Sequence, residues 1–154
     1  MFTRRTVVLG GAFAVAAASQ AKAQGRVREI RVGVTQDALT LDPANHRNRE
    51  TQTVIRNIYD GLLTRDADMR IRPEIAESWR QIDARTYEFR LRSGIRFHSG
   101  DVLTAEDVKF TFDRLTKNNA MGGQTSPRKG LLGPLADTLV VDERTVRMVL
   151  AEPW

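Results

Sequence analysis

Runs of alternating apolar and polar residues predict β-strands in four places. These are residues 28–35, 87–92, 138–141 and 145–150. In each run the apolar side chains recur at every second position, which is typical of a strand with one buried face. The last two runs flank Asp142-Glu143-Arg144 and predict a hairpin closed by a three-residue turn.

Two segments carry apolar residues at helical spacing. In residues 50–63 this spacing predicts a helix that ends near Asp60, because a glycine weakens the last turn. Residues 71–82 predict a second, short helix with a proline near its start. Tyr59 and Trp79 lie on the apolar stripes of these two helices, so we expect both to be core residues rather than ligand platforms.

A third helix is predicted to begin at Thr104. Thr104 and Asp107 have the spacing of a capping box, with aspartate in place of the usual glutamate or glutamine. The helix carries an apolar stripe made of Ala105, Val108, Phe112 and Leu115. Phe110 points away from this stripe, so we expect the helix to touch two layers.

Strands that alternate with helices, together with a hairpin, predict a mixed α/β fold with a mixed sheet. Residues 117–129 show no periodicity and predict a mobile loop. The chain stops at Trp154 directly after a strand, without a terminal helix or polar tail. We therefore expect a truncated chain whose sheet edges lack the neighbouring strands that would pair with them. Alone, such a chain is expected to be unstable or prone to aggregation.

Residues 1–23 have the three parts of a signal peptide: a basic start, an apolar run and small residues before a cut expected at Gln24. The apolar run is too short to span a ~30 Å hydrocarbon core. Arg4-Arg5 resembles the twin-arginine export signal. No cysteine follows that could carry a lipid, so we expect a protein free in a Gram-negative periplasm. The alternative is an N-terminal helix kept in a cytosolic fold.

The net charge of +5 overstates how basic the chain is. Arg4, Arg5 and Lys22 lie in the predicted signal peptide, which leaves 21 basic against 19 acidic residues after it, a charge of +2. Basic and acidic residues alternate there instead of forming a basic stripe, which argues against nucleic-acid binding. The chain has no cysteine, which excludes disulfides, thiolate metal sites and a cysteine nucleophile.

His98, Ser99 and Asp101 are the residues that invite a catalytic or metal-binding interpretation. Neighbouring residues in one turn do not form a Ser-His-Asp triad, which is assembled from distant segments. A metal at His98 and Asp101 would lack a second histidine at ligand spacing, since His46 is far away in sequence. We expect an imidazole that caps the turn, and we assign no catalytic residue and no metal.

Four sequence blocks resemble the family 5 extracellular solute-binding proteins, which include the peptide- and nickel-chelate-binding components of ABC importers. They are Leu-Asp-Pro at 41–43, YDGLL at 59–63, RPEIAESW at 72–79, and YEFRLRSGIRFHSGDVLTAEDVKFTFDRL at 87–115. The last block is the most specific for the family, and we expect its residues to support the fold rather than to form a catalytic site. The resemblance implies a type II-like periplasmic binding protein fold over residues 24–154, incomplete, with the first strand of lobe I and an accessory domain.

The same resemblance implies where a ligand would lie. In the family, the loop after the first strand and the loop after the helix that here begins at Thr104 reach toward the ligand. The corresponding cleft candidates are Thr35, Gln36, Asp37, Leu39, Leu41, Asn119 and Met121. The implied protein is a periplasmic, monomeric receptor without a cofactor, which binds peptides or small solutes such as metal chelates and delivers them to a membrane permease.

Two other functions stay open at this point. One is an exported hydrolase, which would lose turnover when His98 or Asp101 is replaced. The other is a periplasmic sensor or chaperone built on the same fold, since a fold does not fix a function.

Overall fold

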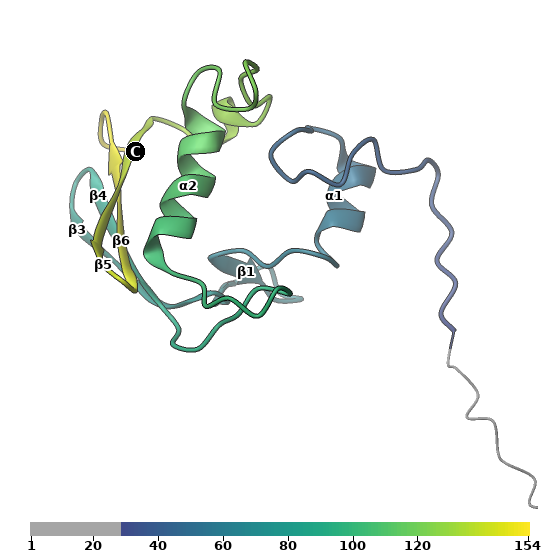
Figure 1. Cartoon of the computed structure of the whole chain (residues 1–154), viewed down its shortest axis with the longest axis horizontal. Coiled ribbons are helices and arrows are strands. Elements are labelled where there is room, and N and C mark those ends of the chain that lie inside the picture. The colour runs from purple at the N-terminus through teal and green to yellow at the C-terminus, as the bar shows by residue number, and fades with distance from the viewer. Residues whose placement is uncertain (1–28) are drawn as a thin grey trace, which may run out of the picture. The chain divides into compact units, whose positions relative to one another are not determined.

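The computed structural model describes residues 29–154, so the predicted signal peptide and its cut site lie outside the described residues. Residues 33–154 form one compact unit. Its elements are α1 (Arg49–Ile55), β1 (Leu63–Arg65), β2 (Ile71–Pro73), β3 (Ala76–Asp83), β4 (Thr86–Leu91), α2 (Ala105–Thr116), a 3₁₀ turn (Lys129–Leu131), β5 (Leu135–Asp142) and β6 (Thr145–Leu150). The mixed α/β class predicted from the sequence is confirmed (Figure 1).

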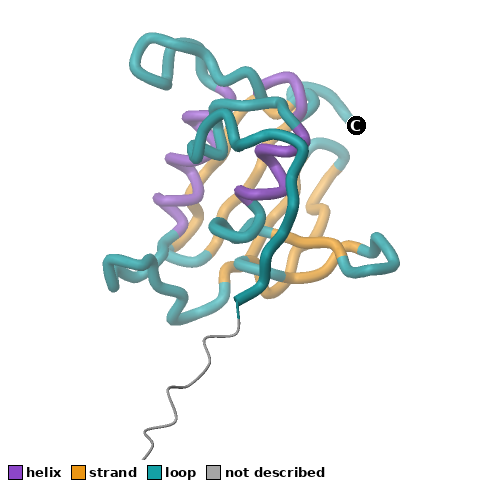
Figure 2. Tube along the Cα trace, turned by 90° about the vertical axis from the view of Figure 1, so that its right-hand side faces the viewer, coloured by secondary structure: helices purple, strands orange, loops and turns teal. Residues whose placement is uncertain are grey.

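The main sheet has four strands in the order β3-β4-β6-β5. All three neighbouring pairs are antiparallel: β3 and β4 form one hairpin, β5 and β6 form another, and β6 also pairs antiparallel with β4. Helix α2 connects the hairpins and runs along one face of the sheet (Figures 1 and 2). A separate two-stranded ribbon pairs β1 with β2.

Both hairpins of the main sheet turn on the same four-residue pattern, Asp-x-Arg-Thr. In each, the first aspartate accepts a hydrogen bond from the backbone N–H two residues later, Asp83 from Arg85 and Asp142 from Arg144, at 2.8 Å. This bond lowers the pKa of both aspartates. Because Asp142 pairs directly with Thr145, the second turn has two residues, not the three that we predicted.

The core lies between the sheet and α2. It consists of Ala76, Phe89, Leu91, Ala105, Val108 and Val146, each at most 9% exposed. The predicted stripe of α2 supplies two of them, and its capping box is present: the Asp107 carboxylate accepts 2.8 Å hydrogen bonds from the backbone N–H and the hydroxyl of Thr104. These contacts fix where α2 begins and which face it turns to the sheet.

The strand predicted at residues 28–35 is not formed over the described part, 29–35. Its side chains Ile30, Val32 and Val34 are 87%, 77% and 55% exposed. A strand needs a neighbour to take its backbone hydrogen bonds, and no described segment pairs with this one. The apolar residues do alternate with polar ones here, but within residues 29–154 no strand pairs with this segment and no surface covers its apolar side chains.

The helix predicted from residue 50 to near Asp60 is shorter than expected. It begins after Asn48, whose side chain accepts a 2.8 Å bond from the backbone N–H of Thr51, and it ends at Ile55. The carbonyl of Leu62 then accepts hydrogen bonds from the backbone of Glu74 and Ala76. This pairing draws the chain into β1, because long-range strand contacts outweigh a weak local helical preference.

The helix predicted over residues 71–82 is wrong, since this segment forms β2 and β3. β3 pairs with β4 over its length, and Trp79 lies opposite Phe89. As an edge strand it leaves Trp79 39% exposed, and Tyr59, which follows the end of α1, is 46% exposed. Neither is therefore the core residue that we predicted. Among residues 29–154 no helix has the length and apolar character needed to cross a membrane.

Candidate functional site

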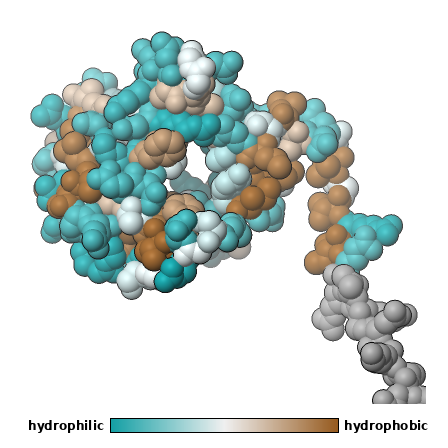
Figure 3. All heavy atoms as spheres, viewed as in Figure 1, coloured by the Kyte–Doolittle hydropathy of each residue, from teal (hydrophilic) through white to brown (hydrophobic). Residues whose placement is uncertain are grey.

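A groove of about 760 Å³ opens between α2 on one side and residues 41–44 and 59–62 on the other. Its walls are mainly apolar and include Leu41, Tyr59, Phe97, Leu103 and Phe110. Figure 3 shows this opening near the middle of the view, with apolar side chains beside it. Phe110 is 69% exposed and lines the groove, so the described residues supply no second layer against α2.

An ion pair joins the two walls of the groove. The guanidinium of Arg114 on α2 binds both carboxylate oxygens of Asp42, with 2.8 Å between Nη1 and Oδ1. The side chains of Arg114 and Asp42 are 31% and 28% exposed. The hydrogen bonds from Arg114 lower the pKa of Asp42, against the opposing effect of burial. The pair ties the loop at residues 36–46 to α2.

Replacing Arg114 with glutamine is expected to destabilise the fold by about 1–2 kcal/mol near neutral pH, since a half-buried carboxylate loses its partner. The folded-state pKa of Asp42 lies below the unfolded one, so the pair stabilises the fold above the ordinary aspartate value of about 3.9. This stabilisation is lost as the pH falls through the folded value. The difference between wild type and variant should therefore shrink on acidification, as measured by urea unfolding.

The control for this titration is Arg70→Gln. Arg70 and Asp68 form a pair 3.7 Å long whose side chains are 69% and 71% exposed, so its removal should change stability little at any pH. An Arg114→Gln difference that stayed constant across the acid range would contradict the assigned role of Asp42.

A second set of contacts joins the loop before α1 to the loop after α2. The Ser126 hydroxyl, in a side chain only 3% exposed, donates to the carbonyl of Ala44 at 2.6 Å and accepts from the N–H of Arg128 at 3.1 Å. His46, 4% exposed, lies 3.2 Å from Nη1 of Arg128. The two loops that the resemblance implied as ligand loops are thus held side by side.

The imidazole of His46 has a defined hydrogen-bonding pattern. Arg128 can only donate, so Nε2 of His46 accepts, and its Nδ1 donates to the carbonyl of Asn48 at 3.3 Å. Nη1 of Arg128 also donates to Oε1 of Gln52 on α1 at 2.6 Å. Burial lowers the pKa of Arg128, and the nearby charge of Arg56 adds to this effect. Arg128 lines the groove.

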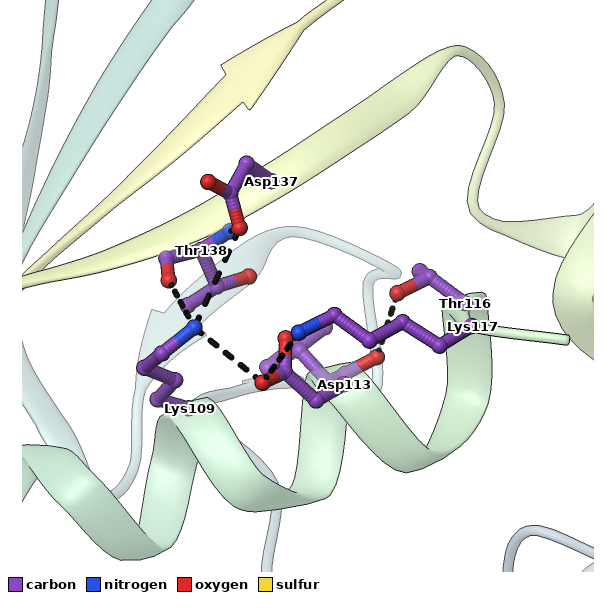
Figure 4. A network of polar contacts seen from close by, with 7 residues as sticks. Lys109, Asp113, Thr116, Lys117, Asp137 and Thr138 are labelled. Atoms are coloured by element: carbon purple, nitrogen blue, oxygen red, sulfur yellow. Dashed lines mark hydrogen bonds and ion pairs between the residues drawn. The ribbon is translucent and has the colours of Figure 1, made fainter. Parts of the chain in front are cut away.

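The opposite side of α2 is anchored to β5 by a polar network (Figure 4). Lys109 donates to the Asp113 carboxylate at 3.1 Å and to the carbonyl of Thr138 at 2.9 Å, and Lys117 pairs with Asp113 at 2.8 Å. Burial raises the pKa of Asp113, but the hydrogen bonds from Lys117 and Lys109 outweigh it and leave the pKa lowered. The network fixes the helix whose other side forms the groove wall.

The seven predicted cleft residues are not gathered at one place. Leu41 lines the groove. In the first loop, Gln36 donates to Glu50 at 3.3 Å, Asp37 accepts from the N–H of Ala38, and the N–H of Leu39 donates to Thr51. Thr35 is exposed. In the second loop, Asn119 has a positive φ of 58° and Met121 pairs with Gln124, and neither lines the groove.

The turn with His98, Ser99 and Asp101 does not form a catalytic arrangement. The Ser99 hydroxyl donates to Oδ2 of Asp101 at 2.8 Å, so serine, not the imidazole that we predicted, caps this exposed turn. The histidine of a triad would instead accept the serine proton. Over residues 29–154 no three His, Asp or Glu side chains gather as they would around a metal ion.

Sequence reasoning missed Arg128, which lines the groove, and its neighbours His46 and Ser126. All three lie in segments without periodicity, and their partners are 76 to 82 residues away in the chain. The only local signal was Asp42 before a proline, which indicated a turn but not an ion pair. Phe110, off the apolar stripe of α2, could have indicated that the helix borders an opening.

Residues 70–154 match the family model described as bacterial extracellular solute-binding proteins, family 5, middle region. This match covers more than half of the chain. The chain belongs to family 5 of the bacterial extracellular solute-binding proteins. The resemblance stated from the four sequence blocks is thereby confirmed.

Family 5 relatives match most of this chain, but they are much longer. The glutathione-binding protein GsiB of Escherichia coli O1:K1 / APEC is 31% identical over 144 residues, which is 93% of this chain and 27% of GsiB. The chain therefore spans about a quarter of the length of the curated relatives that it matches.

Solved structures of periplasmic binding proteins share the fold. AgaA from A. tumefaciens R10, solved with agropinic acid, is 30% identical with a TM-score of 0.67, over 76% of this chain and 23% of AgaA. The Escherichia coli murein tripeptide binding protein MppA is 24% identical with a TM-score of 0.69, over 79% of this chain and 26% of MppA. The periplasmic-binding-protein fold class of this family 5 chain is thereby confirmed.

Proposed function

We propose that this chain is part of the substrate-binding component of an ABC importer, which binds peptides or related small solutes such as metal chelates and delivers them to a membrane permease. The observation that carries the proposal is a match to family 5 over residues 70–154 in a chain whose fold leaves an open groove of about 760 Å³. Ligand sites are typically concave, mainly apolar and furnished with a few polar groups, as this groove is.

The relatives support a small, polar ligand. GsiB is named for glutathione, MppA for a murein tripeptide, and AgaA was solved with agropinic acid. All three are binding proteins and none is named as an enzyme, so the proposal includes no catalytic residue. Leu41 is the predicted cleft residue that lies in the groove, and we propose it as a contact for the apolar part of the ligand.

We further propose a periplasmic, monomeric receptor exported by residues 1–23. The basic start, apolar run and small residues before Gln24 support export, and the absence of cysteine means that no lipid can be attached after the apolar run. The twin-arginine pair and the general secretory pattern predict the same destination.

The proposal predicts that a cognate ligand raises the thermal stability of the protein. At a ligand concentration of about 100 Kd, binding to the folded state alone adds about 2.7 kcal/mol to the free energy of unfolding. Thermal unfolding should be followed for the purified protein against a library of short peptides and metal chelates. We expect a rise of several degrees for one ligand class.

A variant of the groove lining tests whether the ligand binds there. Phe110→Glu places a carboxylate at a lining residue that is 69% exposed, so it should abolish the ligand-induced rise while leaving the core intact. A library without any ligand that shifts the unfolding temperature would count against the proposed function.

A further inference from the structure

Arg128 is a half-buried cation that no carboxylate neutralises. The ion pairs within residues 29–154 include no acidic partner for it. Residues 1–28 contain neither aspartate nor glutamate, so they hold no carboxylate side chain that could serve. A charge withdrawn from water normally needs an opposite charge, and this chain provides none at that place.

The groups that hold Arg128 are neutral, and they use one end of the guanidinium. Nη1 donates to Gln52 and to His46, at 2.6 and 3.2 Å. Across residues 29–154 no side-chain hydrogen bond is formed by its Nη2 or Nε. The guanidinium is thus held in place by Nη1 while its remaining donors stay available for a ligand.

Arg114, in the same groove, is an arginine whose charge is neutralised by a carboxylate. Both residues line it, but Arg114 forms a two-point ion pair with Asp42. A free carboxylate offers the same planar pair of oxygens to Arg128 that Asp42 offers to Arg114. The apolar side chains around it lower the local polarity, which strengthens such a contact relative to one in bulk water.

We infer that Arg128 binds a carboxylate of the transported solute, so that the groove selects ligands with a free acid group over their neutral amides. This inference rests on the proposed function, since it names the chemical class of the ligand that the groove would take. Apolar parts of the same ligand would lie against Tyr59, Phe97 and Phe110, which line the groove with Arg128.

The test compares tripeptide acids that carry an apolar side chain with their C-terminal amides, by isothermal titration calorimetry on the full chain. We expect wild type to bind the acids about 10- to 100-fold more tightly than the amides, the range of a charge-assisted hydrogen bond. In Arg128→Gln this ratio should fall to about one. Arg128→Lys, which keeps the charge, should retain part of the preference.

The control is Arg56→Gln. Arg56 is a nearby exposed cation that does not line the groove, so its removal tests for a general effect of charge, and the preference for acids should remain. Urea unfolding of each variant separates loss of binding from loss of folding. If Arg128→Gln does not fold, the Arg128→Lys ratio carries the test.

Three outcomes would overturn the inference, and they differ in what they say about the proposed function. A preference for acids that persists in Arg128→Gln, or equal binding of acids and amides by wild type, would refute the role of Arg128 but leave solute binding intact. If neither acids nor amides bind, and no other library member shifts the unfolding temperature, the proposed function fails as well.

Discussion

Replacing Leu91 with alanine is expected to lower the free energy of unfolding by about 2–5 kcal/mol. Leu91 is fully buried at the end of β4, where it packs in the cluster between the sheet and α2. Its backbone N–H also donates to the carbonyl of Arg144 at 2.7 Å, in the turn of the other hairpin, so the surroundings have little freedom to close the cavity. Urea unfolding followed by circular dichroism measures the effect.

The matched control is Leu139→Ala on β5. Leu139 is 44% exposed, so the same truncation should cost well under half as much. Equal costs at the two positions would mean that the core is not organised around the buried cluster between the sheet and α2.

The parts of the fold that could be predicted from sequence are those set by local chemistry. Thr104 and Asp107 lie three residues apart, so their capping box can be read from the chain alone. The strand at β4 and the hairpin of β5 and β6 were equally visible, because alternation and a turn-forming aspartate act within a few residues.

The parts that failed depend on distant partners. Residues 76–83 fit a helical pattern, but pairing with β4 makes them strand β3. Nothing within residues 76–83 themselves indicates that β4 will lie beside them. The strand predicted at residues 28–35 failed in the opposite way, since its pattern is correct but no described segment pairs with it. Local preference decides only where long-range contacts do not compete.

The groove shows the same division. Family resemblance indicated the two loops that meet beside it, and the contacts of Ala44 and His46 with Ser126 and Arg128 bring those loops together. The individual residues could not be chosen, because a loop has no periodicity to show which side chains point inward. Of the seven cleft candidates, Leu41 alone lines the groove, whereas both of its arginines were missed.

Replacing Ser126 with alanine is expected to destabilise the junction of the two loops by about 1–3 kcal/mol, the cost of leaving a buried polar group without its partner. The Ser126 hydroxyl supplies the 2.6 Å bond to the carbonyl of Ala44 and accepts from the N–H of Arg128. Ala44 is 4% exposed, so water cannot easily replace the lost donor. Alanine fills nearly the same space, so the change removes the hydroxyl and little packing.

The effect should be local, which distinguishes it from the loss of core packing in Leu91→Ala. Hydrogen exchange should quicken at the N–H of Arg128 and through both loops, while the amides of β4 and β6 keep their protection, because those strands share no hydrogen bond with the loops. Ser99→Ala is the control, since its 2.8 Å bond to Asp101 lies in an exposed turn where water can substitute. Uniform loss of protection in Ser126→Ala would mean that the loops and the sheet unfold as one unit. Local loss would instead mean that Arg128 depends on Ser126 for its position, and ligand binding should then weaken in Ser126→Ala even though the guanidinium is still present.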